Sequence, residues 1–226
     1  MRDAENIREV EKLLTINCQE SRVEGREFNG QLSIVNCQLS INWMGFIFWP
    51  KSSRYVSQRP AYLPTQCKRV GVFVDEEIQS VRRIADEYAL DYIQLHGNES
   101  SEYCAQLQGL HLIKAISVRG RNDIATYRKY EGLVDYFLFD TKCPSVGGSG
   151  KQFDWTVLSV YDGNTPFLLS GGIGPDDAEH LRALRVLDGF PIEKCIGIDL
   201  NSRFELAPGM KDVATLRKFI DELNRK

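Results

Sequence analysis

The stretch that decides the fold is FLLSGGIGPDD, residues 167–177. A short apolar run, predicted to be a strand, leads into two adjacent glycines, which let the backbone approach a ligand because they carry no Cβ. Pro175 suits the first position of a helix, and Asp176 and Asp177 suit its first turn. Because the unpaired N–H groups at a helix start bind anions, the stretch predicts a phosphate site. The alternative is a tight strand-to-helix turn without a ligand.

Similar apolar runs recur along the chain. They end in polar residues, and the segments between them have helical spacing; the runs cover residues 45–48, 70–74, 92–95, 112–116, 136–139 and 195–198. Continuous apolar runs of this length fit strands buried on both faces, as in parallel sheets. The alternation predicts an α/β fold, a (β/α)₈ TIM barrel in which one strand is not identified. The alternative is a doubly wound sheet, which normally carries its glycine-rich turn after the first strand rather than near the end.

Composition limits the class of protein. The chain has 226 residues, close to a minimal (β/α)₈ barrel, so we expect one domain over residues 1–226. Its net charge of −3 argues against nucleic acid as a partner, and no apolar run is long enough to span a membrane. The charged N-terminus does not resemble a signal peptide, and the cysteine spacing fits reduced thiols in the cytoplasm. Only one of the three histidines, His96, follows a predicted strand, so we expect no metal site.

The strand ends carry motifs whose order and spacing are more specific than any one of them. They are GFIFWPKSSRYV (45–56), GVFV (71–74), QLHG (94–97), DTK (140–142) with GGSGKQFDW (147–155), LSGG (169–172), and GIDLNS (197–202) with PGMKD (208–212). In this order they resemble the phosphoribosylanthranilate isomerase family of tryptophan biosynthesis. The resemblance covers the chain from Trp43 to the C-terminus.

The resemblance implies an Amadori rearrangement of N-(5-phosphoribosyl)anthranilate, a small phosphosugar, without cofactor or metal. Such a reaction needs an acid that opens the sugar ring and a base that removes the C2 proton. Asp140 matches the acid, and its environment is then expected to raise its pKa. Arg54 is the candidate for the anthranilate carboxylate, because a guanidinium offers a bidentate fork.

The remaining site residues follow from the same resemblance. Loops after the last two strands of a TIM barrel commonly hold phosphate, which here assigns the phosphate to Gly171, Gly172, Asn201 and Ser202. His96 and Asp199 are expected to line the same mouth and to support substrate binding. Arg203 stands where many family members have glycine, which leaves the shape of that loop open. The protein is expected to be a monomer or a homodimer.

Two departures from the family pattern stand out. Residues 1–7 resemble the start of the first helix, so the first strand, with the cysteine that serves the family as general base, is not in this sequence. We therefore expect that the chain starts at an internal Met and that, as given, it lacks that base. The second departure is an inserted segment at about residues 15–42, which contains a short repeat, QLSI at 31–34 and at 38–41.

Two other functions stay open. One is a different phosphosugar isomerase, epimerase or synthase; a synthase of the same pathway would need a lysine at a strand end, and Lys114 lies inside its predicted strand. The other is a barrel that binds a phosphate ligand without catalysis, because the base is missing from the sequence.

Overall fold

The computed structural model describes residues 1–18, 42–141 and 153–225. The main strands are β1 (Trp43–Ile47), β2 (Lys68–Phe73), β3 (Tyr92–Leu95), β4 (Leu112–Val118), β5 (Tyr136–Thr141), β6 (Phe167–Leu169) and β7 (Cys195–Ile198). The helices are α1 (Ala4–Cys18), α2 (Ile78–Tyr88), α3 (Ser101–Gln106), α4 (Arg121–Ile124), α5 (Ala178–Leu184) and α6 (Val213–Asn224). Shorter elements are the 3₁₀ turns η1 (Ala125–Lys129), η2 (Trp155–Val160), η3 (Ile192–Lys194) and η4 (Ser202–Phe204), and the hairpin strands β8 (Glu205–Ala207) and β9 (Met210–Lys211).

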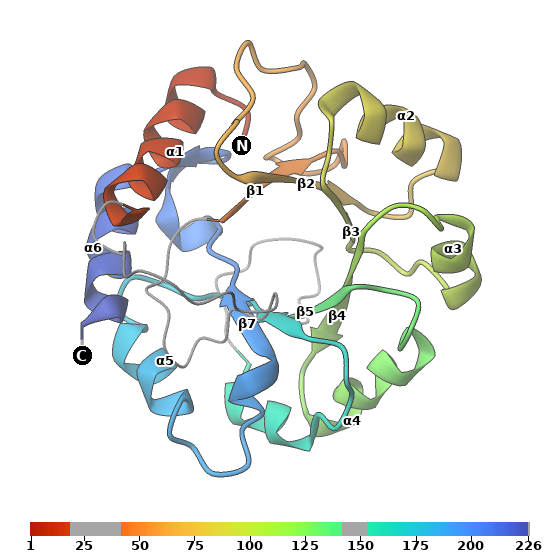
Figure 1. Ribbon diagram of the computed structural model, residues 1–226, viewed down its shortest axis with the longest axis vertical. Coiled ribbons are helices and arrows are strands. Elements are labelled where there is room, and N and C mark those ends of the chain that lie inside the picture. Colours follow the sequence, from red (N-terminus) through yellow and green to blue (C-terminus); the bar gives the residue numbers. More distant parts are fainter. Residues whose placement is uncertain (19–41, 142–152, 226) are drawn as a thin grey trace, which may run out of the picture.

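The main strands form one parallel sheet that curls into an open barrel. Its seven strands pair in chain order from β1 to β7, and helices surround it (Figure 1). This order confirms the barrel and rejects the doubly wound alternative, in which the strand order reverses partway through the sheet. Within the described residues, β1 and β7 pair with no eighth strand of this sheet.

The two faces of the sheet have different cores. The larger cluster joins strand residues such as Phe46 and Phe139 to helix residues such as Val81 and Leu216, so it lies between barrel and helices. The smaller cluster contains only strand residues, Val70, Ile113, Ala115 and Leu138, with partly buried aromatic and aliphatic neighbours. This second set fills the barrel interior. Because side chains alternate along a strand, it also marks which residues point inward.

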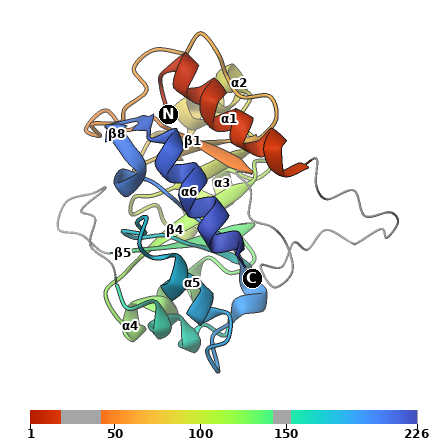
Figure 2. The same ribbon diagram turned by 90° about the vertical axis from the view of Figure 1, so that its left-hand side faces the viewer.

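The side of the barrel between β1 and β7 is covered by α1, α6 and the β8–β9 hairpin. Helix α1 lies beside α6 (Figure 2) and contacts β9. The Asn6 amide donates to Lys211 O, and Lys211 N donates to Asn6 Oδ1, both at 2.8 Å. Arg54, in the loop after β1, pairs with Glu205 at the start of β8, with Nη2 and Oε2 2.7 Å apart. These contacts connect α1 and the loop after β1 to the hairpin that follows β7 in the chain.

One predicted boundary is wrong, and another lies mostly outside the described residues. Helix α1 continues to Cys18, and the rest of the predicted insertion at about residues 15–42, including the repeat, falls almost entirely in residues 19–41, outside the described residues. Helix α5 begins at Ala178 rather than at Pro175. A turn intervenes because Asp177 N donates to Gly174 O at 3.1 Å and Gly174 N donates to Asp177 Oδ2 at 2.6 Å.

The prediction of a single domain stays a prediction, since two internal segments lie outside the described residues. Over the described ranges, none of the helices combines the length and apolar character that a membrane crossing needs.

Candidate active site at the carboxyl ends of the strands

Strand alternation brings the candidate residues into the barrel mouth. On β5, Asp140 shares a face with the interior residues Tyr136 and Leu138; on β3, His96 follows Tyr92 and Gln94 at the same two-residue spacing. Asp140 and Thr141 are the last residues of β5, and His96 directly follows β3. All of them lie at the carboxyl ends of the strands, the end that carries the active site in TIM-barrel enzymes.

A chain of hydrogen bonds leads to the Asp140 carboxyl group. The Gln94 Nε2 amide lies 2.9 Å from His96 Nδ1, and His96 Nε2 lies 3.1 Å from Asp140 Oδ2. Because an amide NH₂ can only donate, Nδ1 accepts, and the ring proton is on Nε2, directed at Asp140. Thr141 N donates to Asp140 Oδ1 at 2.8 Å. Both carboxyl oxygens of Asp140 are therefore held in place by hydrogen bonds.

Asp199 is close to the same group. It follows β7, its backbone N donates to Leu169 O at 2.8 Å, and its Oδ2 accepts from Ser170 Oγ at 3.0 Å. Burial raises the pKa of the Asp199 carboxyl, and the charge of Asp140 raises it too, although Lys211 and the Ser170 hydroxyl oppose the shift. The electrostatic coupling shows that the carboxyl groups of Asp140 and Asp199 lie near each other.

The paired glycines turn away from β6 against the end of β5. Gly171 has φ +95° and Gly172 has φ +72°, values that favour glycine. A Cβ on Gly171 would lie 2.7 Å from Thr141 N, so the turn packs on the backbone next to Asp140 with no room for a side chain. The acid candidate and the glycine turn are therefore neighbours on one rim of the barrel.

The loop after β7 brings Asn201 and Ser202 to this rim. Lys211 holds this loop in place. Its Nζ donates to Leu200 O at 3.0 Å, Asn201 O at 3.1 Å and Asn201 Oδ1 at 3.0 Å. Burial lowers the pKa of the Lys211 ammonium, while Glu205 and Asp199 act in the opposite direction. Ser202 begins the short turn η4, which continues into Arg203.

Arg54 is placed differently from the other candidates. Its Nε donates to Glu205 Oε1 at 3.0 Å and to Oε2 at 2.8 Å, so Glu205 occupies the Nε–Nη2 edge of the guanidinium. Burial alone raises the pKa of Glu205, but the hydrogen bond from Arg54 and the charges of Lys211 and Arg54 bring it below its ordinary value. The structure thus gives Arg54 a structural partner that spacing in the sequence did not indicate.

Lys114, Cys67, Cys104 and Cys195 lie away from the mouth. Lys114 is 2% exposed and points outward from β4, where its Nζ lies 2.9 Å from Glu99 Oε2 and donates to Gly97 O at 2.9 Å. Cys67 precedes β2 and Cys195 begins β7, at the amino ends of the strands, and burial raises the pKa of each thiol to about 12. Cys104 is buried in α3. None of these three supplies a thiolate at the mouth.

Sequence reasoning missed Gln94, Ser170, Lys211 and Glu205. Gln94 and Ser170 were detectable in principle, because Gln94 occupies an inward position of β3 and Ser170 directly follows β6 at the next inward position. Glu205 and Lys211 reach the mouth only through the β8–β9 hairpin, which the sequence analysis did not predict.

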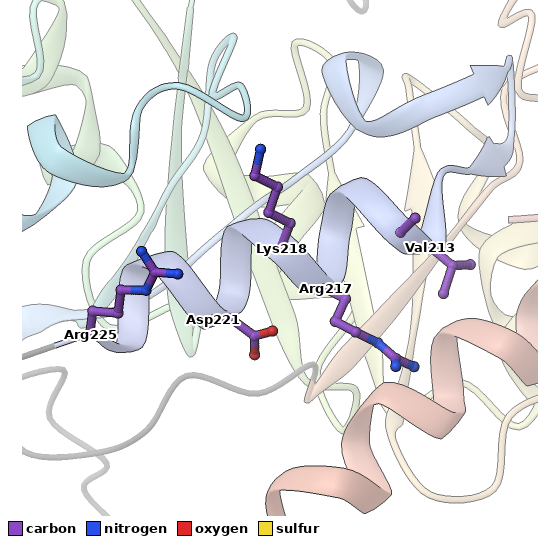
Figure 3. Close-up of a pocket in the computed structure, with 6 residues that line it drawn as sticks. Val213, Arg217, Lys218, Asp221 and Arg225 are labelled. Carbon is purple, nitrogen blue, oxygen red and sulfur yellow. The ribbon is translucent and has the colours of Figure 1, made fainter.

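A surface hollow of about 520 Å³ lies elsewhere, on the outer face of α6 (Figure 3). All the residues that line it belong to α6 or directly follow it: Val213, Ala214, Arg217, Lys218, Asp221 and Arg225. It therefore shares no residue with the barrel mouth.

Comparison with known proteins agrees with this geometry. Residues 31–222 match the family model of N-(5'phosphoribosyl)anthranilate (PRA) isomerase. The N-(5'-phosphoribosyl)anthranilate isomerase of Phocaeicola vulgatus is 50% identical over 191 residues, which cover 84% of this chain and 90% of that protein. The crystal structure of phosphoribosyl anthranilate isomerase from Thermotoga maritima is 32% identical, with a TM-score of 0.68 over 81% of this chain and 88% of that one.

A second solved structure was determined with a ligand. It is a phosphoribosyl anthranilate isomerase in complex with reduced 1-(o-carboxyphenylamino)-1-deoxyribulose 5-phosphate, 29% identical, with a TM-score of 0.65 over 81% of this chain and 88% of that one. The family match spans most of the chain, and the relatives align along nearly their whole length. The chain therefore belongs to the phosphoribosylanthranilate isomerase family.

Proposed function

We propose that this chain is an isomerase of tryptophan biosynthesis that converts N-(5-phosphoribosyl)anthranilate to 1-(2-carboxyphenylamino)-1-deoxyribulose 5-phosphate. The observation that carries the proposal is the adjacency of the Asp140 carboxyl group, at the end of β5, and the Gly171–Gly172 turn, at the end of β6. One small phosphosugar can then reach both an acid and a phosphate cradle. The proposal includes the expected cytoplasmic location.

Asp140 acts as the general acid. It transfers a proton to the ring oxygen of the ribose as the bond from that oxygen to C1 breaks, which leaves a protonated Schiff base between C1 and the anthranilate nitrogen. The Nε2–H of His96 and Thr141 N hold the carboxyl group at 3.1 and 2.8 Å. A positioned acid of this kind contributes a factor of about 10² to 10⁴ to the rate.

Substrate binding is divided between the two sides of the mouth. Backbone groups at Gly171 and Gly172, with Asn201 and Ser202, bind the phosphate. Arg54 binds the anthranilate carboxylate through the guanidinium donors that do not face Glu205. Asp199, held by Ser170, lines the space between the two ends of the substrate.

A base must then accept the C2 proton, which gives an enolamine that tautomerises to the aminoketose. The family resemblance assigns this step to a cysteine on a strand before the first helix. The thiols of Cys67, Cys104 and Cys195 have raised pKa values. In this proposal, the described residues supply the general acid and the groups that bind the substrate.

The test is turnover of N-(5-phosphoribosyl)anthranilate by the purified chain, with binding of the reduced product analogue measured by calorimetry in parallel. We expect binding of the analogue and formation of the aminoketose, which also requires that the chain supply an acceptor for the C2 proton. Binding without turnover would contradict the catalytic proposal and support the non-catalytic alternative. Absence of both would contradict the assignment of the site as well.

A further inference from the structure

We propose that Arg203 is a direct ligand of the substrate phosphate and supplies the positive charge of the cradle. This inference deepens the proposed function and rests on it for the identity of the substrate. It is carried by the position of the guanidinium group, which lies across the two loops that form the cradle.

The first observation is a close approach between the loops after β6 and β7. Arg203 Nη1 donates to Gly172 O at 3.4 Å. The guanidinium also lies against Gly174, where a Cβ would come within 2.5 Å of Arg203 Cζ. The missing side chain at Gly174 is therefore what admits the guanidinium group. As a result, the positive charge of Arg203 sits beside the carbonyl of the glycine turn.

The second observation concerns charge. A phosphate monoester carries a charge of about −1.5 to −2 at neutral pH, and the residues that form the cradle are neutral. Several ionisable neighbours are acidic: Asp140 and Asp199 face the mouth, and Asp177 accepts from Gly174 N. A dianion in this place needs a cation close to it.

Lys211 is not placed to supply that cation. Its ammonium has three donors, and three acceptors of the loop after β7 lie within 3.1 Å of it: Leu200 O, Asn201 O and Asn201 Oδ1. Glu205 Oε1 lies 3.5 Å away on the same side. Lys211 therefore holds the loop rather than the ligand.

In the part of the chain that the structure describes, the guanidinium group of Arg203 has few hydrogen-bond partners. It is exposed, and it makes one long hydrogen bond, to Gly172 O. A guanidinium has five N–H donors in a planar fork that matches phosphate oxygens. The remaining donors can bind two oxygens of a phosphate that also accepts from the backbone at Gly171 and Gly172. A glycine at this position would offer the phosphate only backbone groups, whereas Arg203 also offers a positive charge.

The experiment compares three variants with the wild type. Arg203→Met removes the charge and keeps the apolar stem, Arg203→Lys keeps the charge without the fork, and Arg217→Met makes the same change as the first at an exposed arginine on the outer face of α6 (Figure 3). The measurements are KM and kcat for isomerisation, and the Kd values of the reduced product analogue and of inorganic phosphate at two ionic strengths.

For Arg203→Met we expect KM and both Kd values to rise about tenfold or more, as loss of a charge-assisted hydrogen bond implies. The rise in KM should exceed any fall in kcat, and the salt dependence of binding should weaken. Arg203→Lys should lie between this variant and the wild type, and Arg217→Met should match the wild type.

Unchanged KM and Kd values in an active Arg203→Met variant would overturn the proposal for Arg203 and leave the proposed function standing. If the wild type binds inorganic phosphate but does not isomerise N-(5-phosphoribosyl)anthranilate, the proposed function is overturned. A loss of phosphate binding in Arg203→Met would still support the role of Arg203. A wild type that binds neither phosphate nor the analogue would overturn both.

Discussion

Replacement of Gly171 by Ala tests the packing of the glycine turn against β5. Two effects contribute to the expected loss of stability. The first is backbone strain, because φ is +95° at this position, and an L-residue with a left-handed backbone costs about 1–2 kcal/mol. The second is steric, because the added Cβ would lie 2.7 Å from Thr141 N and 3.2 Å from Thr141 Cβ. Overpacking of this kind costs about 1–3 kcal/mol.

Gly109 provides a matched control that separates the two effects. It lies in the turn between α3 and β4 with φ +92°, and a Cβ there would meet nothing within 4 Å. Gly109→Ala therefore carries only the backbone strain of about 1–2 kcal/mol. We expect Gly171→Ala to be less stable than Gly109→Ala by the steric difference of about 1–3 kcal/mol.

Urea denaturation of the two variants and the wild type measures this difference. Enzyme kinetics give a second readout: Gly171→Ala should also raise KM, because the turn moves away from the phosphate, whereas Gly109→Ala should keep the KM of the wild type. Equal free energies of unfolding for the two variants would refute the reasoning. The turn after β6 would then not abut the end of β5.

Two further predictions concern the contacts around the mouth. In the wild type, ¹⁵N NMR of labelled histidine should show a proton on Nε2 of His96. Gln94→Glu should add a proton on Nδ1, since a carboxylate accepts where the amide donated while Asp140 still accepts from Nε2. A proton on Nδ1 alone in the wild type would contradict the hydrogen-bond chain. Glu205→Gln should lower the free energy of unfolding at pH 7 by about 1.5–3 kcal/mol through its charged hydrogen bonds to Arg54. Because the folded-state pKa of Glu205 lies below its ordinary value of 4.5, its stabilisation is present above that pH and is lost as pH falls through the folded-state value. The gap between variant and wild type should therefore close in urea denaturation as the pH falls below 4.5 and through the folded-state pKa, and a gap that stays constant would refute the ion pair.

The sequence predicted the barrel well because its signal is local and repeated. Each strand is an apolar run with a polar end, and the parallel arrangement puts those ends on one rim. Asp140, His96 and Asp199 could be placed together from this rule alone. The same rule shows that Gln94 points inward with His96, although its hydrogen bond to the ring depends on side-chain conformation.

Other features depend on contacts between distant segments. Arg54 and Glu205 are 151 residues apart, and nothing in their spacing predicts the pair. The start of α5 was misplaced because Pro175 suits a β-turn as well as a first helical turn. The contact between the Arg203 guanidinium and Gly174 likewise depends on how closely the loops after β6 and β7 approach each other.

The most direct test of the central claim is the isomerisation rate of Asp140→Asn beside that of the wild type. Asp221→Asn, the same change on the outer face of α6, serves as the control. The account predicts that kcat/KM of Asp140→Asn falls by about 10² to 10⁴, as for loss of a general acid, while Asp221→Asn matches the wild type. An Asp140→Asn variant whose kcat/KM stays within about tenfold of the wild type would contradict the claim that this carboxyl group opens the sugar ring.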